Sequence, residues 1–242
     1  MLDRLPHWAE PVADYILHTG VKNTLIIAGT SVFLSLVVGV LLGTLLTIKF
    51  VPIRAAIRSY IEIWRGLPII VTIFILFFGL PTLADELHIE ALRLSEIKAA
   101  ILGLSLWGSA QIAEATRGAV QSIPREQHEA SAALGFGWVG RHVNVILPQA
   151  LRRLLPPLVS LSVNVIQNST LAQILGVPEI LETAERGTER LSIPTVDPVT
   201  LEVEGGVDNH AFEIYGAVFV LFFLISFPLT RLAAFLERRL VV

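Results

Sequence analysis

The sequence predicts an all-α integral membrane protein that forms a single transmembrane domain over residues 1–242. Of the 242 residues, 53% are hydrophobic and only 16% are charged, and the mean hydropathy is +0.68. A chain of this length with so few charges is too apolar for an ordinary soluble domain. Long uncharged stretches, separated by connections of unequal charge, support the same fold class.

Five stretches have the length and composition of membrane spans. A hydrocarbon core of about 30 Å requires roughly 20 apolar helical residues. We expect the spans at about residues 24–48, 66–84, 99–120, 154–178 and 214–232. The third stretch is interrupted by Glu114 and Arg117, and their spacing of three residues places both side chains on one helix face.

The segment before the first span mixes polar and apolar residues. It carries Asp3, Glu10 and Asp14, so it lacks the basic flank and continuous apolar core of a signal peptide. Trp8 and Tyr15 suit the headgroup region of a bilayer. We therefore expect an amphipathic helix that lies in the membrane interface.

The charges of the connections predict the orientation. The connections after the first and third spans and the C-terminal tail are rich in Lys and Arg, whereas those after the second and fourth spans are acidic. Short cytoplasmic loops retain Lys and Arg, so we expect the N-terminus outside and the C-terminus in the cytoplasm, on the assumption that the protein lies in a bacterial cytoplasmic (inner) membrane. An odd span count without an internal repeat argues against a complete carrier of two inverted halves, so a pore would need a second copy or a sister chain.

The loop of about residues 124–150 predicts a short helix followed by a tight turn. Pro124 suits the first turn of a helix, and residues 125–134 are rich in helix formers. Gly135 and Gly137 supply left-handed positions that would end this helix. A small exposed helix without a core of its own is typical of a surface that docks a partner.

A second helical segment follows the turn, from Trp138 to about Leu147. We expect it to stop at Pro148, because proline lacks the backbone N–H that a continuing helix needs. The fourth span would then begin at Leu154.

The side chains of the first helix leave two interpretations open. Ala130, Ser131 and Ala133 are small enough for a partner to approach closely, and Glu129 offers a carboxylate to a basic partner. The alternative is an amphipathic connector on the headgroups. The arginines that would then meet anionic lipid are Arg141, Arg152 and Arg153.

The order of residues in this loop resembles the EAA loop of permease subunits of ABC importers. Glu129-Ala130-Ser131 is followed by Gly135 and then by Ile146-Leu147-Pro148. Four further stretches resemble the permeases for polar amino acids of the histidine, glutamine, arginine and glutamate type: "GVKNTLIIAGTSV" from Gly20, "YIEIWRGLPIIV" from Tyr60, "AQIAEATRGAVQSIPREQHEA" from Ala110 and "FLERRL" from Phe235. The resemblance covers nearly the whole chain and implies the type I ABC importer fold.

The sequence departs from that family pattern at two places. Ser131 stands where the family usually has a second alanine, which is a conservative change for docking. Gln167 stands where the family often has a lysine, so a familiar charge is missing from the fourth span and substrate preferences transfer less directly.

The resemblance implies a transporter that is assembled from several different chains. An external binding protein would deliver the solute, two permease subunits would open alternately to each side, and a cytoplasmic ATPase dimer would dock on the short helix. The coupling residues it implies are Glu129, Ala130, Ser131, Ala133, Leu134 and Gly135. No phosphate-binding GxxxxGK[ST] sequence occurs, so this chain would be a non-catalytic subunit without a cofactor of its own, and ATP and Mg²⁺ would be bound by the partner ATPase.

Polar side chains within the spans are candidates for a substrate pathway, because they are costly at membrane depth. The candidates are Gln111, Glu114, Asn164, Asn168, Ser169 and Thr170. The amides could bond an amino-acid zwitterion, and Glu114 could meet a cationic group. Two other interpretations remain open: an ion pair of Glu114 with Arg117 inside the helix, and hydrogen bonds of the amides between helices.

The outer loop of about residues 179–210 is long and acidic. Within it, residues 186–209 contain Pro194, Pro198 and Gly205-Gly206, which predict turns or a small hairpin. We expect this loop either to contact the external binding protein or to be a solvated lid.

Other function classes find less support. The chain has no cysteine, and its six histidines are never at metal-ligand spacing along a helix. No set of catalytic side chains lies at one depth, which argues against a membrane enzyme, and a nucleic-acid partner is not expected. Two alternatives stay open: an ATP-independent carrier or channel subunit that uses Glu114, and an ABC permease for another small solute such as methionine.

Overall fold

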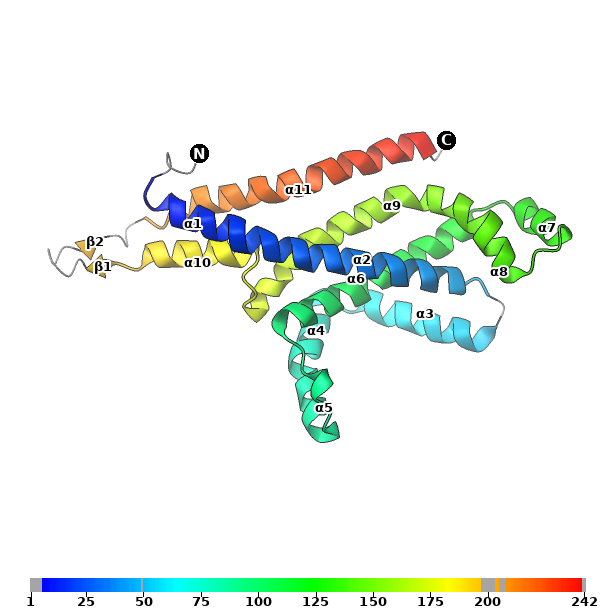
Figure 1. The fold of residues 1–242 in the computed structure, drawn as a ribbon, viewed down its shortest axis with the longest axis horizontal. Helices are drawn as coiled ribbons and strands as arrows, with labels where there is room; N and C mark the ends of the chain where they lie inside the picture. Colours follow the sequence, from blue (N-terminus) through cyan, green and yellow to red (C-terminus); the bar gives the residue numbers. More distant parts are fainter. Residues whose placement is uncertain (1–5, 49, 197–202, 205–207, 241–242) are drawn as a thin grey trace.

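The protein is described by a computed structural model that covers residues 6–48, 50–196, 203–204 and 208–240. The long helices run along one another, α10 and the strands lie at one end of the molecule, and α7 and α8 lie at the other (Figure 1). The α-helices are α1 (Ala9–Tyr15), α2 (Val21–Leu45), α3 (Val51–Gly66), α4 (Ile69–Phe74), α5 (Leu80–Leu87), α6 (Glu96–Gln121), α7 (Arg125–Ala133), α8 (Trp138–Arg141), α9 (Leu147–Asn168), α10 (Ile180–Ser192) and α11 (Ala211–Leu240). The other elements are the π-helical turns η2 (Ile16–Gly20), η3 (Ile75–Gly79) and η5 (His142–Ile146), the 3₁₀ segments η4 (Glu90–Leu92) and η6 (Ser169–Leu175), and the strands β1 (Thr195–Val196) and β2 (Val203–Glu204).

Within the described residues, three helices are long and apolar enough to cross a membrane. They are Ala9–Leu45, Ile69–Leu87 and Ala211–Arg239. α6 and α9 are long helices as well, but they carry more polar and charged side chains and pack between the others. A membrane-embedded helical protein is therefore supported, and the count of five spans stays a prediction.

The first helix begins earlier than the sequence predicts. α1, η2 and α2 form one continuous helix of 37 residues, so the expected separate interfacial helix is wrong. Val12 and Ile16 are buried against Ile180 and Ala184 of α10. Because α10 covers these apolar side chains, the segment belongs to the helix bundle.

A stripe of small residues brings α2 against α6. Ser31, Ser35, Gly39 and Gly43 recur at every fourth position of α2 and are all buried. A Cβ atom at Gly43 would lie 2.3 Å from the carbonyl oxygen of Ala113 on α6. Small side chains at this spacing let two helix backbones approach closely, which is a common mode of packing inside membranes.

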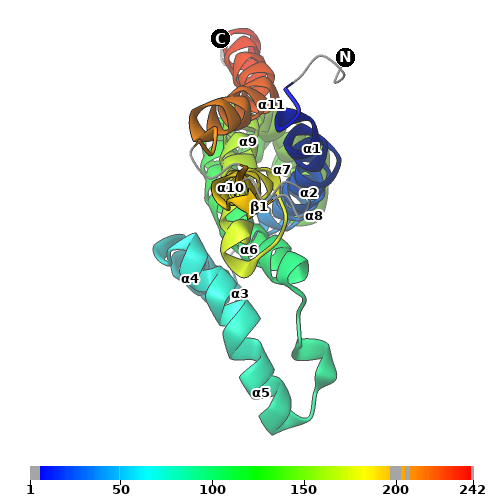
Figure 2. The ribbon, with the colours of Figure 1, turned by 90° about the vertical axis from the view of Figure 1, so that its left-hand side faces the viewer.

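A helical arm leaves the bundle after α3. Ile57 and Ile61 of α3 are buried near α2 and α6. Leu67 is extended and Pro68 is the N-cap of α4, as expected for a residue pair that ends one helix and starts another. α4 and α5 then extend away from the other helices (Figure 2), although Ile73 still packs onto Gly103 of α6.

Pro148 does not stop the helix that precedes it. α8 passes through η5 directly into α9, so the expected break is wrong. Pro148 occupies the first turn of α9, behind a π-helical turn, where its missing N–H is tolerated. Gly137 is also not left-handed, because it has φ −65° and ψ 176° and is the N-cap of α8.

The outer loop is partly helical. α10 extends to Ser192, so residues 186–192 do not form the expected turns, because Ala184, Gly187 and Thr188 form a buried face of this helix. β1 and β2 pair antiparallel, which confirms a small hairpin. Pro198 and Gly205-Gly206, which were expected in its turn, lie outside the described residues.

Candidate functional site

The helix α7 lies with α8 at one end of the molecule (Figure 1). It starts after Pro124 and ends one residue before the predicted Leu134. Gly135 has φ +84°, which confirms its predicted left-handed conformation. Its N–H donates to the Ala132 carbonyl and the Phe136 N–H donates to the Ser131 carbonyl, at 2.9 Å and 3.1 Å. These two bonds close the helix end in a Schellman motif.

The predicted coupling residues do not all face outward. Glu129, Ala130, Ala133, Leu134 and Gly135 are exposed, with Leu134 exposed to 78%. Ser131, in contrast, is only 2% exposed. Its hydroxyl lies 2.7 Å from the Gln127 carbonyl and 3.1 Å from the His128 carbonyl, so it bonds to its own helix.

A buried histidine links this loop to the first long helix. The Nδ1 of His142 donates to the Trp138 carbonyl at 2.9 Å, and its Nε2 lies 2.9 Å from the Thr47 hydroxyl. Burial lowers the pKa of His142, which favours a neutral imidazole with its proton on Nδ1. The single proton of the Thr47 hydroxyl then has two acceptors, Nε2 of His142 and the Thr44 carbonyl at 2.7 Å. The Trp138 ring stacks on the same imidazole with 4.1 Å between centroids.

The base of the loop has a small core of its own. Val120 and Ile123 at the end of α6 pack on Ile146 and Ala150. The Arg153 guanidinium donates to the Ser122 carbonyl at 2.7 Å. The loop is therefore attached to α2, α6 and α9, and a force applied to α7 would be transmitted to these helices.

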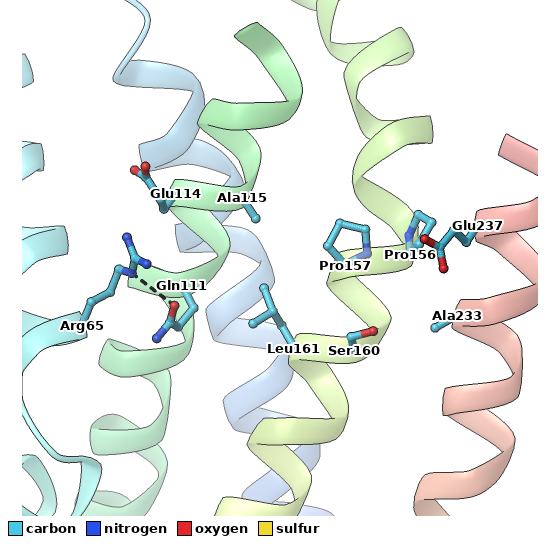
Figure 3. A pocket seen from close by; sticks show the side chains of 10 residues that line it. All are labelled: Arg65, Gln111, Glu114, Ala115, Pro156, Pro157, Ser160, Leu161, Ala233 and Glu237. Atoms are coloured by element: carbon cyan, nitrogen blue, oxygen red, sulfur yellow. Dashed lines mark hydrogen bonds between the residues drawn. The ribbon is translucent and has the colours of Figure 1, made fainter. Parts of the chain in front are cut away.

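A cavity of about 550 Å³ lies between α3, α6, α9 and α11 (Figure 3). Two predicted pathway residues of α6, Gln111 and Glu114, line it. The other lining residues are Arg65, Ala115, Pro156, Pro157, Ser160, Leu161, Ala233 and Glu237. The cavity thus offers a guanidinium, two carboxylates and apolar walls.

Arginines of α3 complete the polar side of this cavity. Arg65 donates from Nε to the Gln111 side chain at 3.2 Å. Glu114 pairs with Arg117 at 2.6 Å, which confirms the predicted ion pair, and also with Arg58 at 3.3 Å. Arg58 and Arg65 were not predicted as site residues, although their spacing of seven residues places them on one helix face.

The other predicted pathway residues, Asn164, Asn168, Ser169 and Thr170, do not line this cavity. The side chain of Asn168 donates to the Asn164 carbonyl at 2.7 Å. Ser169 and Thr170 donate to the carbonyls of Ile166 and Gln167. These bonds within one segment satisfy side chains that would otherwise be costly at membrane depth, so a role in a pathway stays a prediction. Within the described ranges no group of three potential His, Asp or Glu metal ligands occurs.

Comparisons with known proteins agree with this fold. Residues 35–242 match the family described as binding-protein-dependent transport system inner membrane component. The probable amino-acid ABC transporter permease protein YckA of Bacillus subtilis is 36% identical over 166 residues, 69% of this chain and 70% of the relative. The glutamine transport system permease protein GlnP of Escherichia coli K12 is 32% identical over 227 residues, 94% of each chain.

Two solved structures share the fold. An amino acid ABC transporter crystallised with histidines matches with a TM-score of 0.75 and 22% identity, over 94% of this chain and 95% of the other. The methionine ABC transporter MetNI in an inward-facing conformation matches with a TM-score of 0.71 and 18% identity, over 96% and 98%. Since the family model covers most of the chain, this protein belongs to the family of binding-protein-dependent transport system inner membrane components.

Proposed function

We propose that this chain is the permease subunit of an ATP-driven importer of polar amino acids in a bacterial cytoplasmic membrane. The observation that carries the proposal is the exposed helix α7, capped at Gly135 and attached at its base to three long helices. Relatives named as amino-acid and glutamine permeases support the cargo class.

In this proposal the ATPase dimer docks on the exposed face of α7 and the following turn, through Glu129, Ala130, Ala133, Leu134 and Gly135. ATP and Mg²⁺ are bound by that partner. Leu134, Val139 and Val143 are 78%, 65% and 58% exposed, so this end of the chain presents apolar surface that a protein partner would cover. Ser131 is buried beneath this surface, where its hydroxyl donates to the Gln127 carbonyl.

The proposed topology has five spans, with the N-terminus outside and the C-terminus in the cytoplasm. The start of α1 and α10 lie at one end of the molecule, and α7 and the end of α11 lie at the other (Figure 1). This arrangement supports an odd number of crossings. In it the hairpin of β1 and β2 faces the external binding protein.

The cavity between α3, α6, α9 and α11 is the proposed route of the cargo. Arg65 suits the α-carboxylate of an amino acid, and Glu114 and Glu237 suit its ammonium group. Asn164, Asn168, Ser169 and Thr170 would contribute to the route after a change of conformation. A second permease, either the same chain or a sister chain, completes the pore.

Co-purification tests the proposal directly. A tag on the C-terminus, gentle extraction from the native membrane and mass spectrometry should recover an ATPase in stoichiometric amount. Uptake of amino acids by the reconstituted complex should then require ATP and a binding protein. Uptake without any ATPase would contradict the proposal and favour an ATP-independent carrier.

A further inference from the structure

A second, basic pocket lies on the α3 side of the bundle, and the ion pairs of Arg58 and Arg117 with Glu114 separate it from the cargo cavity. It has a volume of about 350 Å³ and is formed by the end of α2, the first two turns of α3 and the end of α6. Its lining residues are Leu46, Val51, Arg54, Ala55, Arg58, Arg117 and Gln121. Among the residues that the structure describes, no acidic side chain lines it.

Positive charge exceeds negative charge around this pocket. Arg58 and Arg117 share the carboxylates of Glu62 and Glu114 through the pairs already formed, with Arg58 2.7 Å from Glu62. Among the described residues Arg54 forms no ion pair. Three guanidinium groups therefore face two carboxylates, and one full positive charge is left for a ligand.

The start of α3 adds to the attraction for an anion. Val51 is the first residue of this 16-residue helix, and its first turn contains no acidic side chain. Pro52 in this turn has no N–H and the Arg54 N–H bonds to the Phe50 carbonyl, so the N–H groups of Val51 and Ile53 and the positive end of the helix dipole lie at this end of α3. Both favour a phosphate group beside the guanidinium groups.

The start of α3 carries exposed apolar side chains, and Val51 among them also lines the pocket. Phe50 and Val51 are each 59% exposed, and Ile53 is 45% exposed. In the orientation proposed above, this end of α3 lies at the cytoplasmic boundary of the membrane. A ligand that fits both features has an anionic phosphate head and hydrocarbon chains.

We propose that the pocket of Arg54, Arg58 and Arg117 binds the headgroup of an anionic phospholipid from the cytoplasmic leaflet. The phosphate lies between the guanidinium groups, and the acyl chains run along Phe50, Val51 and Ile53. Basic pockets between membrane helices are a recurrent form of lipid recognition. This proposal rests on the orientation proposed above and is independent of the cargo.

Thermal unfolding of the full chain, with any partner that co-purifies, tests this site without an uptake assay. The probes are short-chain phosphatidylglycerol, phosphatidylcholine of the same chain length, and inorganic phosphate at matched ionic strength. Phosphatidylglycerol at ten times its Kd should raise Tm by about 3 °C, and the other two should not. An equal shift with inorganic phosphate would show that the pocket binds a soluble anion and would overturn the lipid proposal. An equal shift with phosphatidylcholine would show that the pocket does not recognise the anionic headgroup.

Arg54→Gln is the decisive variant, because Arg54 is exposed and makes no pair whose loss would unfold the chain. It should lose at least half of the phosphatidylglycerol shift, and Arg54→Glu should abolish it. Arg238→Gln, an exposed arginine on α11, should keep the whole shift. An unchanged shift in Arg54→Glu, or an equal loss in Arg238→Gln, would overturn the proposal.

Discussion

The imidazole of His142 and the hydroxyl of Thr47 meet across 95 residues of chain, with 2.9 Å between Nε2 and Oγ1. Thr47 follows the last turn of α2, and His142 lies in the π-helical turn behind the α7 loop. The loop that we propose to receive the ATPase is therefore bonded to the first long helix. A movement of the loop would act on α2 as well as on α6 and α9.

Thr47→Val removes this hydroxyl while it keeps the shape of the side chain. We expect a loss of about 1 kcal/mol in stability, because the buried Nε2 of His142 and the Thr44 carbonyl both lose the hydroxyl as a partner. In the reconstituted importer, the ATP hydrolysed per solute moved should rise. Thr82→Val is the control, since the exposed Thr82 bonds only to its own helix. Equal effects of both variants would contradict a role for the His142 bond.

Gly135→Ala should weaken the end of α7. No atom obstructs a Cβ at this position, but φ +84° is strained for alanine, so we expect a cost of about 1 kcal/mol and looser coupling of ATP hydrolysis to uptake. Gly118→Ala is the matched control: Gly118 is an exposed helical glycine with open space around it, and alanine there should stabilise α6 slightly. Thermal unfolding and uptake per ATP are measured for both variants. Equal values for Gly135→Ala and Gly118→Ala would show that the left-handed cap is unimportant.

Gly43→Ala should separate α2 from α6. The added methyl group would lie 2.3 Å from the Ala113 carbonyl oxygen and 2.5 Å from the Thr116 Cβ. We expect a destabilisation of about 1–3 kcal/mol, because neither backbone can move without losing other contacts. Gly29→Ala, in the same helix with nothing within 4 Å of its Cβ, should be tolerated. Similar unfolding temperatures for the two variants would show that the small-residue stripe does not set the helix distance.

Glu179 should make stability depend on pH. It is fully buried at the N-cap of α10, where its Oε1 accepts the Glu182 N–H at 2.9 Å and its Oε2 has no partner among the described residues. Burial raises the pKa of Glu179 to about 7. Between its ordinary pKa and 7 the folded chain binds this proton more tightly than the unfolded chain. The free energy of unfolding should therefore fall as the pH rises through that window.

Glu179→Gln should remove this dependence. Between pH 5 and pH 8 the parent chain should lose up to about 3 kcal/mol more stability than the variant. Exposed Glu185 provides the control variant Glu185→Gln, which should follow the parent chain. Parallel pH profiles for the parent and Glu179→Gln would show that Glu179 stays ionised in the folded state.

Arg65→Gln tests the cavity as a cargo route. Removal of the guanidinium should lower amino-acid uptake at least tenfold, because a carboxylate in the cavity would lose its charged partner. Binding of the ATPase should be unaffected, since Arg65 lies on α3, away from the α7 loop (Figure 1). Arg152→Gln, an exposed arginine in the first turns of α9, is the control. Normal uptake by Arg65→Gln would remove the cavity from the route.

The local order of residues was enough to predict the helical membrane class and the main features of the α7 loop. Pro124, the run of helix formers and Gly135 are signals that act within one turn of the chain. The same signals failed at Pro148 and Gly137. There the conformation depends on η5, whose buried His142 is bonded to Thr47 of another helix.

The sequence by itself determined that this chain forms long apolar helices, where α7 begins and ends, and which family its motifs resemble. Only the tertiary structure decided which helices meet and which side chains come together. α10 covers the start of the first helix, Ser131 faces inward, and Arg65 lines one cavity with Gln111 and Glu114. The physical reason is that hydrophobic periodicity reports which face of a helix avoids water. It does not report which other helix covers that face.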